Sequence, residues 1–370
     1  MDAGFDVWID WYHDRLEGRL LDAKLERKWA LLLNDALTES AGEINARLKA
    51  VRDEHFGHQA SQETIPEIPE SQEPGLQFAP REDGRIDLTP SGIAPPDDVA
   101  EILAMRGVIV EALDDLLILL AGSNAYPSIA QVADRYKSAI SADELSVDLL
   151  YAYGVRLENS RTRLEVEIKS GDCPAMAVPA GEALDSVIAL HGPVVYSTAR
   201  GKELVERARA FEADGLDVSA YKSAAQQVAT AIDEADEAVT KLARETIRQA
   251  SDEIGEGKHP ERSAQLGHTT LSNFMIAAAK GVQQGFAAQA LEEGVKDGIK
   301  DGHKTIAKWG YVGSATAVGI AAYAAAPAVL SFFIANQPLL HQFSIVAGCE
   351  LSWLPSFLNW LERQRARINI

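Results

Sequence analysis

Apolar residues recur at helical spacing from residue 98 to residue 308, so the sequence predicts an all-α body over this range. Its clearest helix is predicted over residues 219–254, where apolar side chains step by four and three residues along one face. These side chains are Val228, Ile232, Ala235, Val239 and Leu242. Such a heptad seam fits either a coiled-coil partner surface or one long helix that packs on its own bundle.

Shorter patterns predict local boundaries within this body. Residues 98–121 are apolar but carry three carboxylates near the middle, which indicates a buried core helix and not a membrane span. Residues 141–144 have the spacing of a capping box, so we expect a helix to begin there. Residues 161–168 alternate between polar and apolar positions, a pattern that fits a short strand.

Proline sets residues 57–97 apart from the helical body. The prolines of this stretch are Pro66, Pro69, Pro74, Pro80, Pro90, Pro95 and Pro96. Because proline lacks a backbone donor and fixes its own dihedral angle, the stretch cannot form one continuous helix and is predicted to be a linker. Inside it, residues 76–79 and 85–88 flank Asp83-Gly84, a pair that favours a small β-hairpin.

Glycines recur at four-residue intervals near the end of the helical body. They are Gly281, Gly285, Gly294, Gly298 and Gly302. On one helix these glycines would form a smooth stripe that lets another backbone approach closely, so we expect a helix-packing role. Each glycine also weakens a helix in water by about 1 kcal/mol relative to alanine, so a helix that is not always formed is the alternative.

The carboxy-terminal region contains the longest uncharged run, since no Asp, Glu, Lys or Arg occurs from residue 309 to residue 349. Residues 311–335 are long and apolar enough to span a bilayer, and residues 339–361 form a second apolar stretch after a turn at 336–338. Basic residues precede the first stretch and follow the second, which favours a hairpin with both chain termini in the cytoplasm.

Several residues define the predicted spans. They are Tyr311, Gly313, Gly319, Pro327, Phe332, Phe333, Glu350 and Trp353. Proline is tolerated in membrane helices, and tryptophan suits the membrane interface. Glu350 would mark a helix interface, a conduction path, or a segment that lies on the surface instead of crossing it. The alternative for the whole region is an alanine-rich helix buried inside a soluble bundle.

Composition narrows the function further. The 370 residues carry a net charge of -20, which repels phosphate backbones and argues against nucleic-acid binding. With only two cysteines no disulfide framework is expected, and the opening residues lack the basic and apolar regions of a secretory signal. No nucleotide-binding, hydrolase or zinc-protease motif occurs, so we predict no catalytic residue, no metal and no cofactor. An enzyme site assembled from scattered helices would leave no such motif.

The amino-terminal residues 4–20 carry an aromatic stripe at helical spacing. The stripe and its neighbours follow a W-x2-W-Y-x2-R-L-x-G pattern, made by Trp8, Trp11, Tyr12, Arg15, Leu16 and Gly18. This pattern resembles an amino-terminal segment of uncharacterised alphaproteobacterial proteins. A looser match to the same group is an H-G-x4-S-x3-G-x2-L pattern, made by His191, Gly192, Ser197, Gly201 and Leu204. The resemblance covers about a fifth of the chain and implies a bacterial source but no activity.

Together these features predict four regions: an aromatic-rich helical segment (1–56), the linker (57–97), an acidic helical body (98–308), and an apolar hairpin with a basic tail (309–370). The expected protein is a non-enzymatic protein of the bacterial inner membrane, either an anchored interaction protein or a membrane-permeabilising effector. Its expected partners are the lipid bilayer, an unidentified protein and further copies of itself. The alternative is a soluble helical interaction or oligomerisation protein with a buried apolar carboxy terminus.

Overall fold

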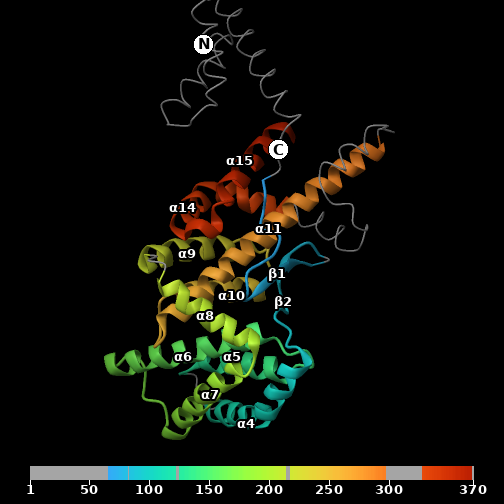
Figure 1. Ribbon diagram of the computed structural model, residues 1–370. Coiled ribbons are helices and arrows are strands. Elements are labelled where there is room, and N and C mark those ends of the chain that lie inside the picture. Colours follow the sequence, from blue (N-terminus) through green and yellow to red (C-terminus); the bar gives the residue numbers. More distant parts are fainter. Residues whose placement is uncertain (1–65, 82, 122–124, 214–216, 297–326, 369–370) are drawn as a thin grey trace, which may run out of the picture. The chain divides into compact units, whose positions relative to one another are not determined.

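The computed structural model describes residues 66–81, 83–121, 125–213, 217–296 and 327–368 (Figure 1). The amino-terminal aromatic motif and most of the first predicted span therefore lie outside the described residues. The described chain from residue 66 onward belongs to one compact unit. It is mostly helical, as predicted, with one two-stranded sheet.

The two strands form the hairpin expected within the proline-rich stretch. β1 (Gln77–Pro80) and β2 (Ile86–Thr89) are antiparallel, with Phe78 opposite Leu88. Gly84 has a φ of 85°, the left-handed conformation that the turn requires and that glycine adopts without strain. The backbone of β2 is also hydrogen-bonded to a segment outside the hairpin, because the amide of Ile86 donates to Ala238 O at 2.8 Å. An isolated pair of strands is marginally stable, so this support matters.

The first half of the helical body is a four-helix cluster. It contains α4 (Pro96–Leu120), α5 (Pro127–Ser141), α6 (Val147–Ser170) and α7 (Val178–Tyr196). Their buried side chains form one apolar core, and α4 packs on α5 and α7. Proline occupies the first turn of α4, α5 and α7, where its missing donor would have no helical partner in any case.

The second half surrounds the long helix α11 (Pro260–Lys296). It also contains α8 (Ala199–Ala213), α9 (Val218–Asp233) and α10 (Lys241–Asp252). The carboxy-terminal elements are the helix Pro327–Ala335, α14 (Gln337–Ala347), the 3₁₀ turn η1 (Gly348–Leu351) and α15 (Leu354–Ile368). Helix α6 contributes buried side chains to the cores of both halves, so it joins them.

The structure corrects three local predictions. Residues 219–254 do not form one helix, because residues 238–240 turn their backbone toward β2: the amide of Thr240 donates to Ile86 O at 2.9 Å. The heptad seam is therefore split between α9 and α10. Residues 161–168 are helical within α6 and not a strand. The helix predicted to begin at residues 141–144 begins at Val147 instead, where Ser146 caps it by accepting from the Leu149 amide at 3.2 Å.

The carboxy-terminal apolar region is divided into short helices. The helix Pro327–Ala335 and α14 meet at an angle of 75°, with the break at Asn336, where a turn was predicted. The second apolar stretch is interrupted at Gly348, which has a φ of 79°. Among the described helices none is by itself long and apolar enough to span a bilayer, and only this bent pair meets both criteria jointly.

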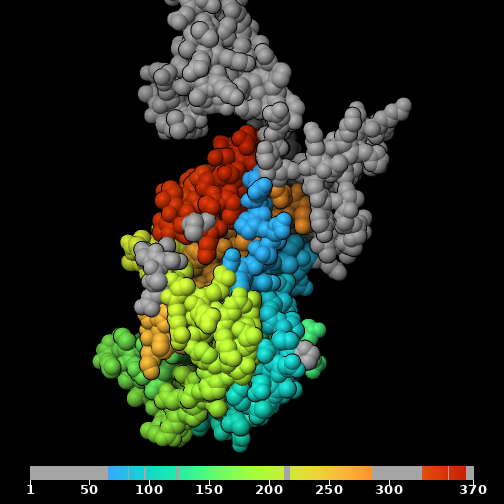
Figure 2. Space-filling model, viewed as in Figure 1, coloured from blue at the N-terminus to red at the C-terminus, as the bar shows by residue number. Residues whose placement is uncertain are grey.

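This region packs against the body through aromatic side chains. Phe343 of α14 lies 5.7 Å from the ring of Tyr221 on α9, and Phe332 lies 6.2 Å from Phe274 on α11. Phe333 and Phe357 contact each other at 5.1 Å between ring centres. Figure 2 shows the carboxy-terminal segment, in red, lying against the yellow and orange elements. Part of the described apolar run therefore belongs to the core of this unit, namely Val329, Phe332, Phe333, Leu340, Phe343 and Ala347.

Candidate functional site

The first polar cluster holds residues 66–76, which we call the strap, against α11. The side chain of Asn273 is fully buried and pairs with the strap backbone as a neighbouring strand would. Its Nδ2 donates to Glu73 O at 2.9 Å and to Leu76 O at 2.8 Å, and its Oδ1 accepts from the Glu73 amide at 2.7 Å. One amide side chain thus satisfies three backbone groups of an extended segment.

Two further side chains of α11 hold the beginning of the strap. Lys280 donates to Glu70 O, and Gln283 donates to Pro66 O at 3.3 Å. Burial lowers the pKa of Lys280. From α8, Arg207 forms an ion pair with Glu73. The strap therefore follows α11 along its described length, although proline prevents it from being helical.

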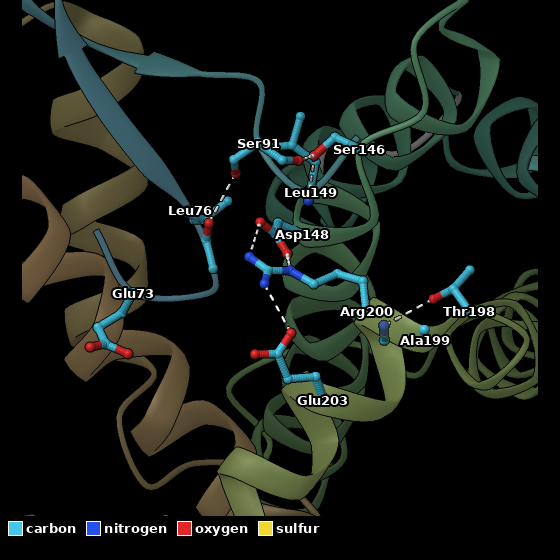
Figure 3. A network of polar contacts seen from close by, with 12 residues as sticks. Glu73, Leu76, Ser91, Ser146, Asp148, Leu149, Thr198, Ala199, Arg200 and Glu203 are labelled. Carbon is cyan, nitrogen blue, oxygen red and sulfur yellow. Dashed lines mark hydrogen bonds and ion pairs between the residues drawn. The ribbon is translucent and has the colours of Figure 1, made fainter. Parts of the chain in front are cut away.

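Hydrogen bonds of two serine side chains connect the strap to the start of α6 (Figure 3). Ser91 donates through Oγ to Gly75 O at 3.0 Å, and Ser146 donates to Ser91 O. Because Ser146 is also the cap of α6, the same hydroxyl fixes a helix terminus and the segment that follows the hairpin.

Asp148 and Arg200 form the centre of the network drawn in Figure 3. Nε and Nη2 of Arg200 bind Oδ1 and Oδ2 of Asp148 at 2.9 and 3.1 Å, while Nη1 binds Glu203 at 3.0 Å. Hydrogen bonding with Asp148 raises the pKa of Arg200. Gly92 lies against the carboxylate, and a Cβ there would come within 2.6 Å of it at a φ of +58°. Only glycine fits this approach.

His268 of α11 joins the carboxy-terminal segment to the body. Its Nδ1 lies 2.8 Å from Glu350 Oε2, and its Nε2 lies 3.2 Å from Ala347 O. Both ring nitrogens therefore face oxygen atoms of the carboxy-terminal segment. The hydrogen bond from His268 lowers the pKa of Glu350. The aromatic rings of Phe211 and Tyr221 each lie 5.2 Å from the imidazole and shield it from water.

Arg156 and Glu253 form a buried pair where α6 meets the end of α10. Arg156 Nε lies 3.7 Å from Glu253 Oε1, and Asn159 donates to Glu253 Oε2 at 3.3 Å. Burial lowers the pKa of Arg156 and raises the pKa of Glu253, since both charges lose water. Within the described residues, Nε and Nη1 of Arg156 have no hydrogen-bond partner.

His191 of α7 is a core residue. Its Nδ1 lies 3.1 Å from Tyr136 Oη, and burial lowers its pKa from 6.5 to about 4. The ring lies against Gly154 of α6, where a Cβ would come within 2.0 Å of the imidazole. The site therefore has space for a neutral ring and no water to solvate a charged one.

We expect this histidine to make stability depend on pH. The unfolded chain binds the proton at higher pH than the folded chain, so stability is complete above about pH 6.5 and falls as pH drops toward 4. The loss should reach about 3 kcal/mol, and His191→Gln should remove it. Urea unfolding of both proteins between pH 7 and 4 measures the difference. Parallel pH profiles for the two proteins would contradict this assignment.

These clusters use their polar groups to join elements of the fold. Within the described ranges no group of three His, Cys, Asp or Glu side chains is placed to hold a metal ion. The fork of Arg200 is bound to two carboxylates, and both nitrogens of His268 face acceptors from the carboxy-terminal segment. The arrangement attaches the strap and the carboxy-terminal segment to the helical body.

The predicted span residues fall into two groups. Tyr311, Gly313 and Gly319 lie outside the described residues. Pro327, Phe332, Phe333, Glu350 and Trp353 are described, and the two phenylalanines are in the core while Glu350 meets His268.

Of the glycine stripe, Gly281 and Gly285 lie in α11 and are buried, and Gly294 lies near the end of the same helix. Gly298 and Gly302 lie outside the described residues. At Gly281 a Cβ would meet the side chain of Ile86 at 3.9 Å, an ordinary contact.

No family model, curated protein or solved structure matches this chain. Its function therefore has to be argued from its own residues. Sequence reasoning missed Asn273, His268 and Arg200, whose partners are far away along the chain. One signal was present: α11 carries many polar residues on all its faces, which a long helix with an ordinary apolar stripe would not. They include the buried Ser263, Gln265, His268, Thr269, Thr270, Ser272 and Asn273.

Proposed function

We propose that this chain is a non-enzymatic helical interaction protein whose apolar carboxy-terminal segment belongs to its own core. The observation that carries this proposal is the packing of that segment. Phe333, Phe343 and Trp360 are each at most 1% exposed. Phe343 packs on Tyr221 of α9 and Phe332 packs on Phe274 of α11, so apolar side chains of the described part of the run, residues 327–349, lie against protein.

The polar clusters support the same proposal. Asn273 holds the strap, Arg200 holds the start of α6, and His268 holds the carboxy-terminal segment, so each stabilises a rigid scaffold. A scaffold of this kind presents surfaces to partners, and its acidity favours partners of positive charge.

A membrane-anchored form is the second proposal. It is favoured by the bent pair Pro327–Ala335 and Gln337–Ala347, which is apolar enough to enter a bilayer when both helices are taken together. It is also favoured by Ile345 of α14, a large apolar side chain that is 79% exposed. In this form the protein would be anchored in the bacterial inner membrane, with both termini cytoplasmic, and further copies could pack together as a permeabilising assembly.

Ile345→Asp in the full chain separates the two proposals. If α14 belongs to the core of a scaffold, the substituted side chain lies in water and the free energy of unfolding should change by less than about 0.5 kcal/mol. If α14 enters lipid, a carboxylate on its outer face should release the protein from membranes. Carbonate extraction of membranes and thermal unfolding of the same preparations measure both effects.

Val178→Asp is the matched control, because Val178 is 70% exposed on α7, in the other half of the body. The scaffold proposal expects both variants to fractionate and unfold like the unsubstituted chain. Wild-type protein that resists extraction, together with loss of retention for Ile345→Asp alone, would overturn it in favour of the anchor.

A further inference from the structure

The outer face of α4 exposes an unusual number of large apolar side chains. Leu103 is 46% exposed, Val108 57%, Ile118 72% and Leu119 43%. The inner face of the same helix is covered, since it packs on α5 and α7. Helix α4 thus carries large apolar side chains on both sides, although only one side is covered within the described unit. Several large apolar side chains exposed on one helix face are a feature of binding surfaces.

A shallow hollow of about 320 Å³ lies at the amino-terminal half of this face. It is lined by Leu103, Arg106, Gly107, Val110 and Ser141. Arg106 donates to Ser141 O at 2.7 Å, which joins two of these lining residues. At Gly107 a Cβ would meet nothing within 4 Å, so the backbone there is open to close approach. The hollow has the size and lining to accept one or two apolar side chains.

Carboxylates separate the apolar side chains along the face. Glu101, Glu111 and Asp115 are exposed, and none of them forms an ion pair with another described residue. Glu111 lies one turn beyond Gly107, and Asp115 lies one turn beyond Glu111. The face therefore alternates between apolar anchors and unpaired negative charge. A complementary surface needs apolar side chains at helical spacing with positive charges between them.

We propose that this face of α4 binds a basic amphipathic helix of a partner protein. The apolar stripe of that helix would cover Leu103, Val108 and Ile118, with one side chain in the hollow, and its lysines or arginines would pair with Glu111 and Asp115. A second copy of this chain fits worse, because it would bring carboxylates of the same face together. An anionic lipid surface is repelled by the same carboxylates.

This inference rests on the proposed interaction function and names the class of partner. Its test uses the full chain and a synthetic helical peptide of about 18 residues made of leucine and lysine, with the leucines on one face. The same peptide with glutamate in place of lysine is the probe control. Fluorescence anisotropy of the labelled peptides gives the dissociation constants.

We expect the leucine–lysine peptide to bind and the leucine–glutamate peptide not to bind. Val108→Ser and Glu111→Gln should each weaken binding at least tenfold. The matched controls are Val178→Ser, another exposed valine, and Glu237→Gln, an exposed carboxylate beyond α9. Both controls should leave binding within about twofold, as expected for changes outside the contact.

Three results would overturn the proposal. In the first, the leucine–lysine peptide does not bind. In the second, it binds the α4 variants as tightly as it binds the control variants. In the third, the unsubstituted chain is a dimer and the Val108→Ser variant is a monomer. The second result would show attraction to the overall negative charge, and the third would show that a second copy covers the face. None of them affects the outcome of the Ile345→Asp test, so failure of this surface is distinguishable from failure of the proposed function.

Discussion

Phe343→Ala should lower the free energy of unfolding by about 3–5 kcal/mol, the range for removing a large aromatic side chain from a packed core. Phe343 is fully buried, and its ring lies 5.7 Å from Tyr221 on α9. Removing it opens a cavity beside Tyr221, which can collapse only if α14 moves on α9. Urea unfolding of the full chain at neutral pH gives the value.

The control lies two residues away on the same helix. Ile345 is 79% exposed, so Ile345→Ala should change stability by less than about 0.5 kcal/mol. A large difference between the two variants requires that α14 has one face in protein and one face out of it. Equal and small losses for both would mean that α14 does not pack on the body, and would remove the observation on which the scaffold proposal depends.

Local sequence patterns were sufficient for the fold class and for the hairpin. Helical periodicity requires only near neighbours, and Asp83-Gly84 encodes its turn within the turn itself. The prediction of one long helix over residues 219–254 was wrong for the opposite reason. Its apolar spacing continues through the break, but residues 238–240 pair with β2, which is remote in the sequence. The backbone groups that the local pattern assigned to a helix are instead hydrogen-bonded to Ile86 of β2.

Hydropathy could not distinguish lipid from protein core as the environment of the carboxy-terminal run, because both environments favour apolar residues. Glu350, which follows this run, contacts His268, and only folding brings these two residues together. From the sequence, Glu350 marked a helix interface, a conduction path or a surface segment, but nothing near it in the sequence indicated which residue it contacts.

The polar clusters were beyond sequence reasoning for the same reason. Asn273 binds the backbone of Glu73 and Leu76, and backbone groups have no identity that a motif could record. Catalytic and metal motifs are recognisable because several side chains recur at fixed spacing. A single side chain that binds a distant main chain has no such spacing.

Glu253→Gln should also be costly, because it leaves the guanidinium of Arg156 buried without a counter-charge. Arg156 is 2% exposed, and its Nε lies 3.7 Å from the carboxylate. Breaking a buried ion pair by removing one partner typically lowers the free energy of unfolding by about 3–5 kcal/mol. The glutamine keeps the volume of the side chain and an acceptor for Asn159, so lost charge accounts for the expected loss. Urea unfolding measures it.

Arg156→Met/Glu253→Leu removes both charges and is the matched control. The long apolar side chains fill a similar volume, and the double variant should regain most of the stability that Glu253→Gln loses. Such a result would show that the pair is required as a pair and adds little over an apolar contact. If the double variant is as unstable as Glu253→Gln, removing the charge on Arg156 does not restore stability, and a buried guanidinium without a counter-charge is not the cause of the loss at this junction of α6 and α10.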